Sequence, residues 1–339
     1  MTNLGRTRPI VSRSARNVRL LALAVLVPVA GLGALAVGSA ALPFHVVLAS
    51  LTHPFAGGID HTIVWQLRVP RIVIGICIGA GLGVSGVLLQ SLFRNPLVDP
   101  YITGVAAGAA VAATLAFALE LSFAVVPAVA FGGGLACAAL VTLIASGDTP
   151  AANLRLVLAG VAISAMCSAI VYLLLLRSGQ AGGLPILSWL AGGISGRGWS
   201  DLRWTSIYLL AGFIAAFSQV HALNALRLGS VAAAGFGLRV DRARWFVLIT
   251  ASLLTSACVA LSGIVGFVGL MVPHAVRRWI SGDARWLLCG SALAGATVVV
   301  LADLLARSLA PPAEIPLGVL LALVGVPFFL SLTRHPVEL

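Results

Sequence analysis

Residues 68–110, RVPRIVIGICIGAGLGVSGVLLQSLFRNPLVDPYITGVAAGAA, decide the fold. The part at 72–93 contains no charged residue and is long enough for a helix that crosses a membrane, which needs about 20 apolar residues. Glycine recurs through it at spacings that let helices approach closely. The stretch therefore predicts a tightly packed membrane helix that ends in a break at FRNPLVDP, where two prolines interrupt the apolar run.

The rest of the chain repeats this pattern. Of its 339 residues 60% are hydrophobic and 9% are charged, against about 25% charged in a soluble domain. The uncharged runs predict ten helices, at 18–40, 66–92, 102–120, 123–145, 154–176, 204–222, 245–262, 264–276, 287–309 and 316–332. We expect an all-α, polytopic integral membrane protein with a single transmembrane domain over 1–339. The run at 264–276 is too short to span alone and predicts a partly re-entrant element.

Charge sets the expected orientation. The 21 basic residues are all arginine, and the formal net charge is +11. Placing both termini in the cytoplasm, with 1–17 as a cytoplasmic tail, leaves few arginines outside, which agrees with the positive-inside rule. The outer ones would be Arg68, Arg71, Arg177, Arg197, Arg203 and Arg307. The positive charge is therefore interpreted as membrane topology and not as nucleic-acid binding. The apolar N-terminal run resembles a secretion signal, but the many spans that follow indicate an uncleaved first helix.

No catalytic constellation is visible in the sequence. A phosphate-binding G-x-x-x-x-G-K-[ST] loop is impossible without lysine, and no H-E-x-x-H occurs. We therefore expect no enzyme activity, no cofactor and no metal on this chain, so any ATP must bind a partner. The cysteines lie in apolar runs without C-x-x-C pairing and are interpreted as small packing residues. Three histidines, His45, His53 and His61, share an outer loop but match no metal-ligand spacing.

Two charged groups at the outer side stand out. Arg68 and Arg71 open the second predicted helix, where arginines either extend toward lipid headgroups or dock an acidic partner through paired hydrogen bonds. Asp303 and Arg307 are four residues apart on one helix face. They could neutralise each other, or Arg307 could face a partner.

Two further sets of residues invite a functional interpretation. The basic, glycine-punctuated segment 223–244 is cytoplasmic and long enough for two short helices that dock a soluble partner. The glycine-rich runs predict tight helix packing, and the same helices could also line a translocation path. The candidates for the path or packing are Gly79, Gly83, Gly86, Gln90, Asn95, Pro96, Gly104 and Gly108.

Residues 68–110 resemble the most recognisable stretch of the permease family that imports ferric siderophores, haem and cobalamin with a binding protein and an ATPase. Further blocks resemble the family in the same order: NLRLVLAGVAIS, SWLAGGISGRGW, SGIVGFVGLMVPHAVRRWISGDARWLL, ADLLAR and IPLGVLLALVGVPFFL. They begin at residues 153, 188, 262, 302 and 315. The likeness covers essentially the whole chain, so we expect the membrane subunit of an ATP-driven (type II ABC) importer.

The resemblance implies the partners and the roles of several residues. It implies a homodimer of ten-helix subunits in the bacterial inner membrane, with the path at the dimer axis, two ATPase subunits below and one periplasmic binding protein above. Arg68, Arg71 and Arg307 match the arginines that pair with glutamates of the binding protein. The loop that meets the ATPase corresponds to Leu223, Leu226, Leu228, Gly229, Ser230, Gly235, Gly237 and Leu238. The cargo would be an iron chelate or cobalamin, and the sequence does not select among them.

One departure from the family concerns this loop. Ser230 and Val231 stand where the family usually carries acidic residues, so either the ATPase differs to match or the loop docks mainly through apolar packing. The alternative function is a proton-coupled secondary transporter, which needs buried acids along a path. Its only candidates near the membrane are Asp99, Glu120 and Asp303.

Overall fold

The computed structural model describes residues 12–37, 42–52, 58–122, 124–145, 152–280, 283–311 and 313–334, and these ranges contain helices but no strand. The longer helices are α1 (Arg13–Ala36), α4 (Val69–Phe93), α5 (Val105–Ala118), α6 (Val126–Ala145), α7 (Ala152–Leu190), α8 (Trp199–Ser218), α11 (Val240–Ser262), α12 (Val268–Trp279), α13 (Ala284–Ser308) and α14 (Leu317–Arg334). The short ones are α2 (Phe44–Thr52), α3 (Ile59–Thr62), the π-helical η1 (Ile63–Arg68), the 3-10 turn η2 (Pro100–Thr103), α9 (Val220–Arg227) and α10 (Ser230–Gly235).

Each of the ten predicted segments corresponds to one of the longer helices, which confirms the all-α, polytopic class. Six helices in the described ranges are long and apolar enough to cross a membrane, or up to seven if the bent pair α8 and α9 is one span. The number of spans, ten, therefore stays a prediction. Of the predicted N-terminal tail, residues 1–11 lie outside the described part of the chain, as does His53 in the outer loop.

The structure corrects several of the predicted elements. Three helices begin five residues earlier than predicted: α1 at Arg13, within the predicted 1–17 tail, α8 at Trp199, and α11 at Val240, within the predicted 223–244 loop. The helix predicted at 66–92 starts earlier, because α3, η1 and α4 form one continuous helical run over 59–93. The helix predicted at 154–176 continues as α7 to Leu190, since the glycines at 179, 182 and 183 and Pro185 lie inside the helix and do not end it. The outer loop predicted after the first helix contains α2.

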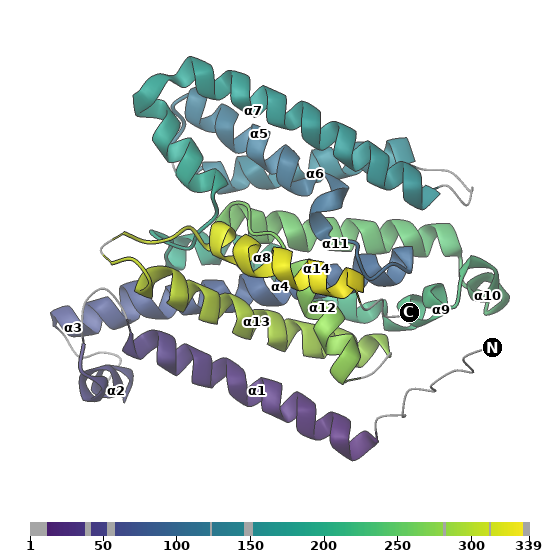
Figure 1. Cartoon of the computed structure of the whole chain (residues 1–339), viewed down its shortest axis with the longest axis horizontal. Helices are drawn as coiled ribbons and strands as arrows, with labels where there is room; N and C mark the ends of the chain where they lie inside the picture. Colours follow the sequence, from purple (N-terminus) through teal and green to yellow (C-terminus); the bar gives the residue numbers. More distant parts are fainter. Residues whose placement is uncertain are drawn as a thin grey trace.

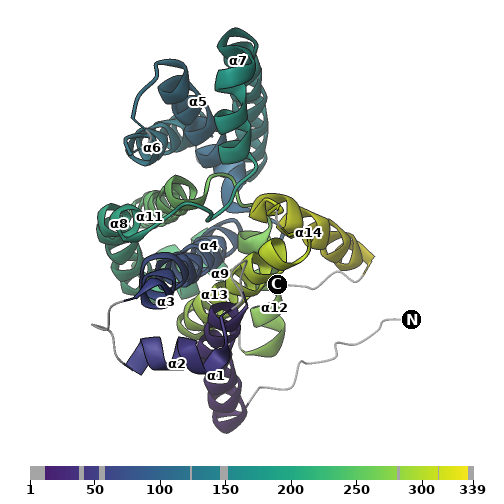
Figure 2. The ribbon, with the colours of Figure 1, turned by 90° about the vertical axis from the view of Figure 1, so that its left-hand side faces the viewer.

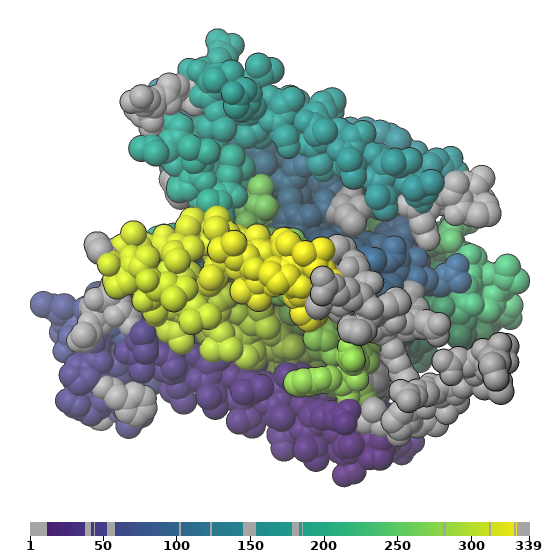
Figure 3. All heavy atoms as spheres, in the orientation of Figure 1, coloured from purple at the N-terminus to yellow at the C-terminus, as the bar shows by residue number. Residues whose placement is uncertain are grey.

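The helices form a bundle with α4 at its centre (Figures 1 and 2). Figure 2 shows α5, α6 and α7 grouped at one end of the molecule, α4, α8, α11 and α13 in the middle, and α1 with α2 at the other end. Figure 3 shows α14 on the surface of one face, between α7 and α1. Most residues of α4 are buried, whereas α1 keeps a long apolar side exposed, as expected of a peripheral helix that faces lipid.

The centre of the bundle is closed by backbone contact between α4 and α13. A Cβ atom on Gly79 would lie 2.1 Å from the carbonyl oxygen of Gly295, and one on Gly83 would lie 2.3 Å from that of Ser291. Only glycine allows two helices to approach this closely. These glycines therefore allow α4 and α13 to pack in direct backbone contact.

Gln90 and Tyr101 hold two breaks in the bundle: residues 94–99, between α4 and η2, and residues 263–267, between α11 and α12. Residues 94–99 return alongside the end of α4, where the buried Gln90 amide donates to the carbonyl oxygens of Val98, Gly269 and Leu270 at 3.3–3.4 Å. The Tyr101 hydroxyl donates to the carbonyl of Val265 at 2.6 Å and accepts from its N–H at 3.0 Å. These bonds satisfy backbone groups in the break before α12. The helix α12 itself is short, with 12 residues, as its sequence predicted.

Candidate functional site

The outer end of the bundle holds a cluster of charges centred on Arg71. Its guanidinium donates to the Asp303 carboxylate at 2.9–3.1 Å and, through Nη1 and Nη2, to the Glu314 carboxylate at 3.0 Å. One cation from α4 thus joins α13 to the segment that precedes α14. Asp303 is buried, whereas the Glu314 side chain is about one-third exposed, so the two carboxylates differ in how easily water reaches them.

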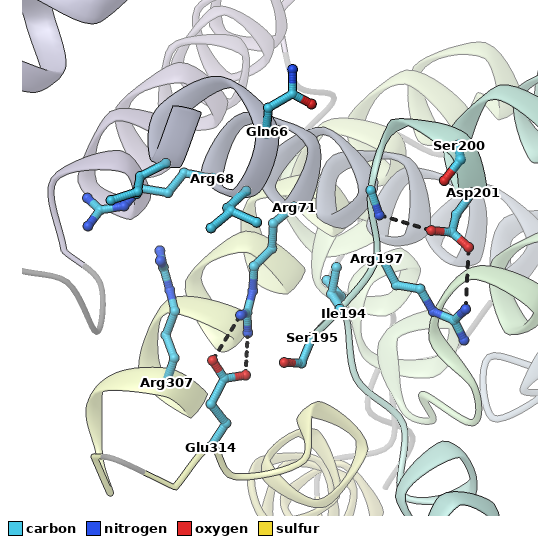
Figure 4. A pocket seen from close by; sticks show the side chains of 14 residues that line it. Gln66, Arg68, Arg71, Ile194, Ser195, Arg197, Ser200, Asp201, Arg307 and Glu314 are labelled. Carbon is cyan, nitrogen blue, oxygen red and sulfur yellow. Dashed lines mark hydrogen bonds and ion pairs between the residues drawn. The ribbon is translucent and has the colours of Figure 1, made fainter. Parts of the chain in front are cut away.

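Arg68 and Arg307 lie beside this ion-pair group and connect it to α1. Arg68 Nη1 donates to the carbonyl of Leu35, and Arg307 Nη2 donates to the carbonyl of Ala34. Both side chains are buried, with 5% and 8% of their surface exposed. Figure 4 shows their guanidinium groups turned to the same side, away from Ser195. Two cations therefore hold the end of α1 against α4 and α13.

A pocket of about 560 Å³ opens over these side chains. Its other wall carries Arg197, which pairs with Asp201 at 3.4 Å at the start of α8 (Figure 4). Hydrogen bonds from Arg71, with help from Ser195, lower the pKa of Glu314, while burial lowers the pKa of Arg197. Glu314 therefore stays ionised at pH values below the usual pKa of a glutamate. The Arg71–Glu314 pair is thus charged at neutral pH.

The structure brings the three predicted docking residues, Arg68, Arg71 and Arg307, into one cluster. It also shows that internal groups already engage them. Asp303 lies 3.8 Å from Arg307, so the predicted neutralisation within α13 is weaker than the unpredicted pairing with Arg71. Glu314 is a site residue that the sequence analysis missed. The only available signal was its position directly before the IPLG block, on the same outer side as the arginines.

The cytoplasmic loop forms the two short helices that its length predicted, α9 and α10. Leu223 and Leu226 are buried and fasten α9 to the bundle, whereas Leu228, Val231 and Phe236 are 64%, 90% and 73% exposed. We call these three side chains the apolar patch. Large apolar groups exposed on a water-facing loop are typical of a protein-interaction surface.

The other predicted residues of this loop shape it or lie at its surface. Gly229 and Gly237 adopt φ of +103° and +77°, which side-chain-bearing residues rarely do, and they set the turns before and after α10. Ser230 accepts a hydrogen bond from Arg244 at 3.4 Å. Gly235 is exposed and Leu238 is half-buried.

The loop is also joined to α13. The Asn224 side chain of α9 accepts a hydrogen bond from the Ala284 N–H at 2.9 Å and contacts the Asp283 carboxylate at 3.5 Å, at the first residues of α13. The same helix carries Asp303 and Arg307 near its other end. A single helix therefore reaches from the cytoplasmic loop to the outer charge cluster.

The residues proposed for packing or a path have packing surroundings in the described chain. Gly79, Gly83 and Gly86 face the backbone of α13 or α12, and Gly104 and Gly108 face α6. Gln90 is buried and bonds three carbonyls, as described above. Asn95 caps the turn after α4 by accepting from the Leu97 N–H at 2.9 Å, and Pro96, half-buried, lies within that turn.

The acids on which proton coupling would depend lie at helix ends or are paired. Asp99 accepts from the Tyr101 N–H and caps η2, Glu120 is exposed after α5, and Asp303 is held by Arg71. A helical, polytopic chain with a charge cluster at its outer end and an apolar patch at its cytoplasmic end defines the class of protein: a membrane permease that works with soluble partners.

Comparison with known proteins places the chain within that class. It belongs to the FecCD transport family, whose model matches residues 24–335. It is 39% identical to the cobalamin import system permease protein BtuC of Halobacterium salinarum, covering 96% of this chain and 89% of the relative. It is 37% identical to the hemin transport system permease protein HmuU of Yersinia pestis, covering 91% and 93%.

A solved structure supports the same assignment. An inward-facing ABC transporter assigned to the metal-chelate type superposes with a TM-score of 0.83 at 33% identity, over 93% of this chain and 98% of that one. The chain is therefore a permease subunit of an ABC importer, a multi-pass protein of the bacterial inner membrane, and not itself a catalytic subunit.

Proposed function

We propose that this permease moves an iron chelate, either a ferric siderophore or haem, or cobalamin, with ATP hydrolysed on two separate ATPase subunits and cargo delivered by a periplasmic binding protein. The observation that carries the proposal is the placement of two partner-type surfaces at opposite ends of α13: the arginine cluster outside and the apolar patch inside. Relatives that are named for cobalamin, hemin and Fe(3+)-citrate import support this choice of cargo.

The decisive experiment is uptake into proteoliposomes that contain the permease with its ATPase. Binding protein loaded with haem, a ferric siderophore or cobalamin is added outside, and ATP is enclosed. We expect ATP-dependent accumulation of one cargo. Uptake that follows a proton gradient without the ATPase would contradict the proposal and favour the secondary transporter.

The permease is proposed to work as a homodimer. Both glycine-rich helix pairs that could have formed path walls, α4 with α13 and α5 with α6, are closed by backbone contact within the described chain. A bulky cargo must therefore cross outside these pairs, and a second copy would supply the opposite wall. Light scattering on the purified permease should give two copies per particle, and a monomeric permease that remains active would contradict this.

Docking of the binding protein is proposed to occur by carboxylate exchange at Arg71. Asp303 is buried and would remain bound to Arg71 throughout, but Glu314 is partly exposed and lies in the loop before α14. A glutamate of the binding protein can take the place of Glu314 because it offers the same bidentate geometry. Glu314 thus occupies the docking position until the partner arrives.

Glu314→Gln is expected to tighten docking, because the competing charge is removed while an exposed pair of this kind contributes only about 1 kcal/mol or less to stability. We predict a dissociation constant for the binding protein lower by about threefold to tenfold, measured by interferometry on nanodiscs. Glu120→Gln is the matched control, since it removes one exposed acid at the same end without touching Arg71. Equal effects of the two variants, or weaker docking of Glu314→Gln, would contradict the exchange.

The apolar patch is proposed to dock the ATPase. It would replace the contacts that acidic residues at positions 230 and 231 would make, since this chain has Ser230 and Val231 there. Phe236→Asp should reduce co-purification of the ATPase with the tagged permease at least about tenfold, because a charge would be buried in an apolar contact. Phe236→Leu is the control and should retain the ATPase. Full retention by Phe236→Asp would contradict apolar docking at this patch.

A further inference from the structure

The peripheral helix α1 is fastened at its two ends. At the outer end it is held through Leu35 and Ala34 by Arg68 and Arg307. At the cytoplasmic end Arg19 Nη1 donates to the carbonyl of Trp279, the last residue of α12. Between these points much of the helix exposes apolar side chains such as Leu21 and Val29, so lipid surrounds it. Its cytoplasmic end therefore lies where phospholipid headgroups begin.

Arg16, one turn before Arg19, stacks over the Trp286 ring with its guanidinium carbon 4.3 Å from the ring centroid. Its Nε atom is buried and has no hydrogen-bond partner among the described residues. An enclosed guanidinium N–H without an acceptor is costly, and a phosphate oxygen is the acceptor that guanidinium groups prefer at a membrane surface. The unpartnered Nε thus indicates a ligand that the described residues do not supply.

The surroundings of Arg16 favour an anion. Arg13, Arg19, Arg278 and Arg285 are exposed around the ends of α1, α12 and α13. Asp283, the acid nearest in sequence to Arg278 and Arg285, is already used, since it caps α13 by accepting from the Arg285 N–H and contacts Asn224. No acidic residue occurs in α1. The indole of Trp279 belongs to a residue that is 62% exposed, and tryptophan is typical of the headgroup level.

We propose that the cytoplasmic ends of α1, α12 and α13 form a binding site for the headgroup of an anionic phospholipid of the inner leaflet. The phosphate would accept from Arg16 and from the exposed arginines, with the acyl chains lying along the apolar side of α1. Basic residues near the membrane surface attract anionic lipid by about 1 kcal/mol each, a factor of about five per arginine.

The test uses the purified full-length permease in nanodiscs of phosphatidylcholine that contain a minor fraction of brominated lipid. Tryptophan fluorescence should be quenched more strongly by brominated phosphatidylglycerol than by brominated phosphatidylcholine. The double variant Arg278→Gln/Arg285→Gln should lower the preference for phosphatidylglycerol by about tenfold or more. Neither side chain takes part in a hydrogen bond among the described residues. Arg16→Gln should lower it as well, and Trp279→Phe should remove part of the quenching.

Arg177→Gln/Arg203→Gln is the matched control, because it also removes two exposed arginines, here from the predicted outer side, and it should leave the preference unchanged. Equal quenching by the two brominated lipids would overturn the site. So would an equal loss in the two double variants, which would show attraction to the protein as a whole.

Discussion

Arg71→Met is expected to destabilise the permease by about 3 to 5 kcal/mol, because it leaves the buried Asp303 carboxylate without its principal partner. Arg307 is a weaker partner, since its Nε lies 3.8 Å from Asp303 and its Nη2 is bound to the carbonyl of Ala34. Thermal unfolding in detergent, followed by size-exclusion chromatography, should show a clear fall in melting temperature. Arg203→Met is the control for loss of an exposed outer arginine.

The double variant Arg71→Met/Asp303→Asn separates stability from docking. Neutralising Asp303 removes the buried charge, so much of the lost stability should return, whereas docking of the binding protein should not. An Arg71→Met protein that melts like the wild type would contradict the assigned ion pair. Recovery of docking in the double variant would instead show that Arg71 serves only the fold.

Gly79→Ala is expected to have a comparably large effect from a single methyl group. The added Cβ would lie 2.1 Å from the carbonyl oxygen of Gly295, a backbone atom that cannot rotate away, so α4 and α13 must move apart. Overpacking of a close-packed interior costs typically 1 to 3 kcal/mol, and a backbone clash places this variant at about the upper end or beyond. We predict a strong loss of folded protein, measured as monodisperse yield and melting temperature.

Gly75→Ala provides a control on the same helix, one turn away. Its Cβ would meet only side-chain methyl groups of Val300, Ile194 and Val299, at 3.4–3.9 Å, which is ordinary van der Waals contact. This variant should keep wild-type yield and stability. Similar losses in the two variants would indicate that alanine is disfavoured anywhere in α4, and not that the helices touch at Gly79.

Most of the fold follows from local features of the sequence. Apolar runs of membrane length predicted the helices, and glycine spacing predicted where they pack, because one residue type at one spacing is sufficient for a backbone contact. The short helix after Gly263 and the two cytoplasmic helices were also predicted. The start of the helical run α3–η1–α4 at Ile59 and the end of α7 were not, since the π-helical η1 and the continuation of α7 depend on neighbouring segments and not on local glycine or proline.

The charge cluster shows where sequence reasoning ends. Spacing within α13 indicated a pair between Asp303 and Arg307, but the closer partner of Asp303 comes from α4, 232 residues away. Glu314 reaches the same guanidinium from 243 residues away. Nothing local distinguishes Glu314 from an ordinary loop acid, so tertiary structure alone reveals that Arg71 is shared. Likewise, arginine at a helix start does not tell whether the side chain is exposed or, as for Arg68, buried against a carbonyl of α1.

The length of α13, which reaches from the cytoplasmic loop to the outer charge cluster, has a thermodynamic consequence. Asn224 holds the first residues of α13, and Asp303 lies about five turns further along, so the two proposed partner surfaces are joined by one helix about 30 Å long. A partner that shifts α13 at one end changes the free energy with which the other partner binds at the opposite end, and such coupling is reciprocal. If nucleotide on the ATPase weakens docking of the binding protein by some factor, docking must weaken nucleotide binding by the same factor.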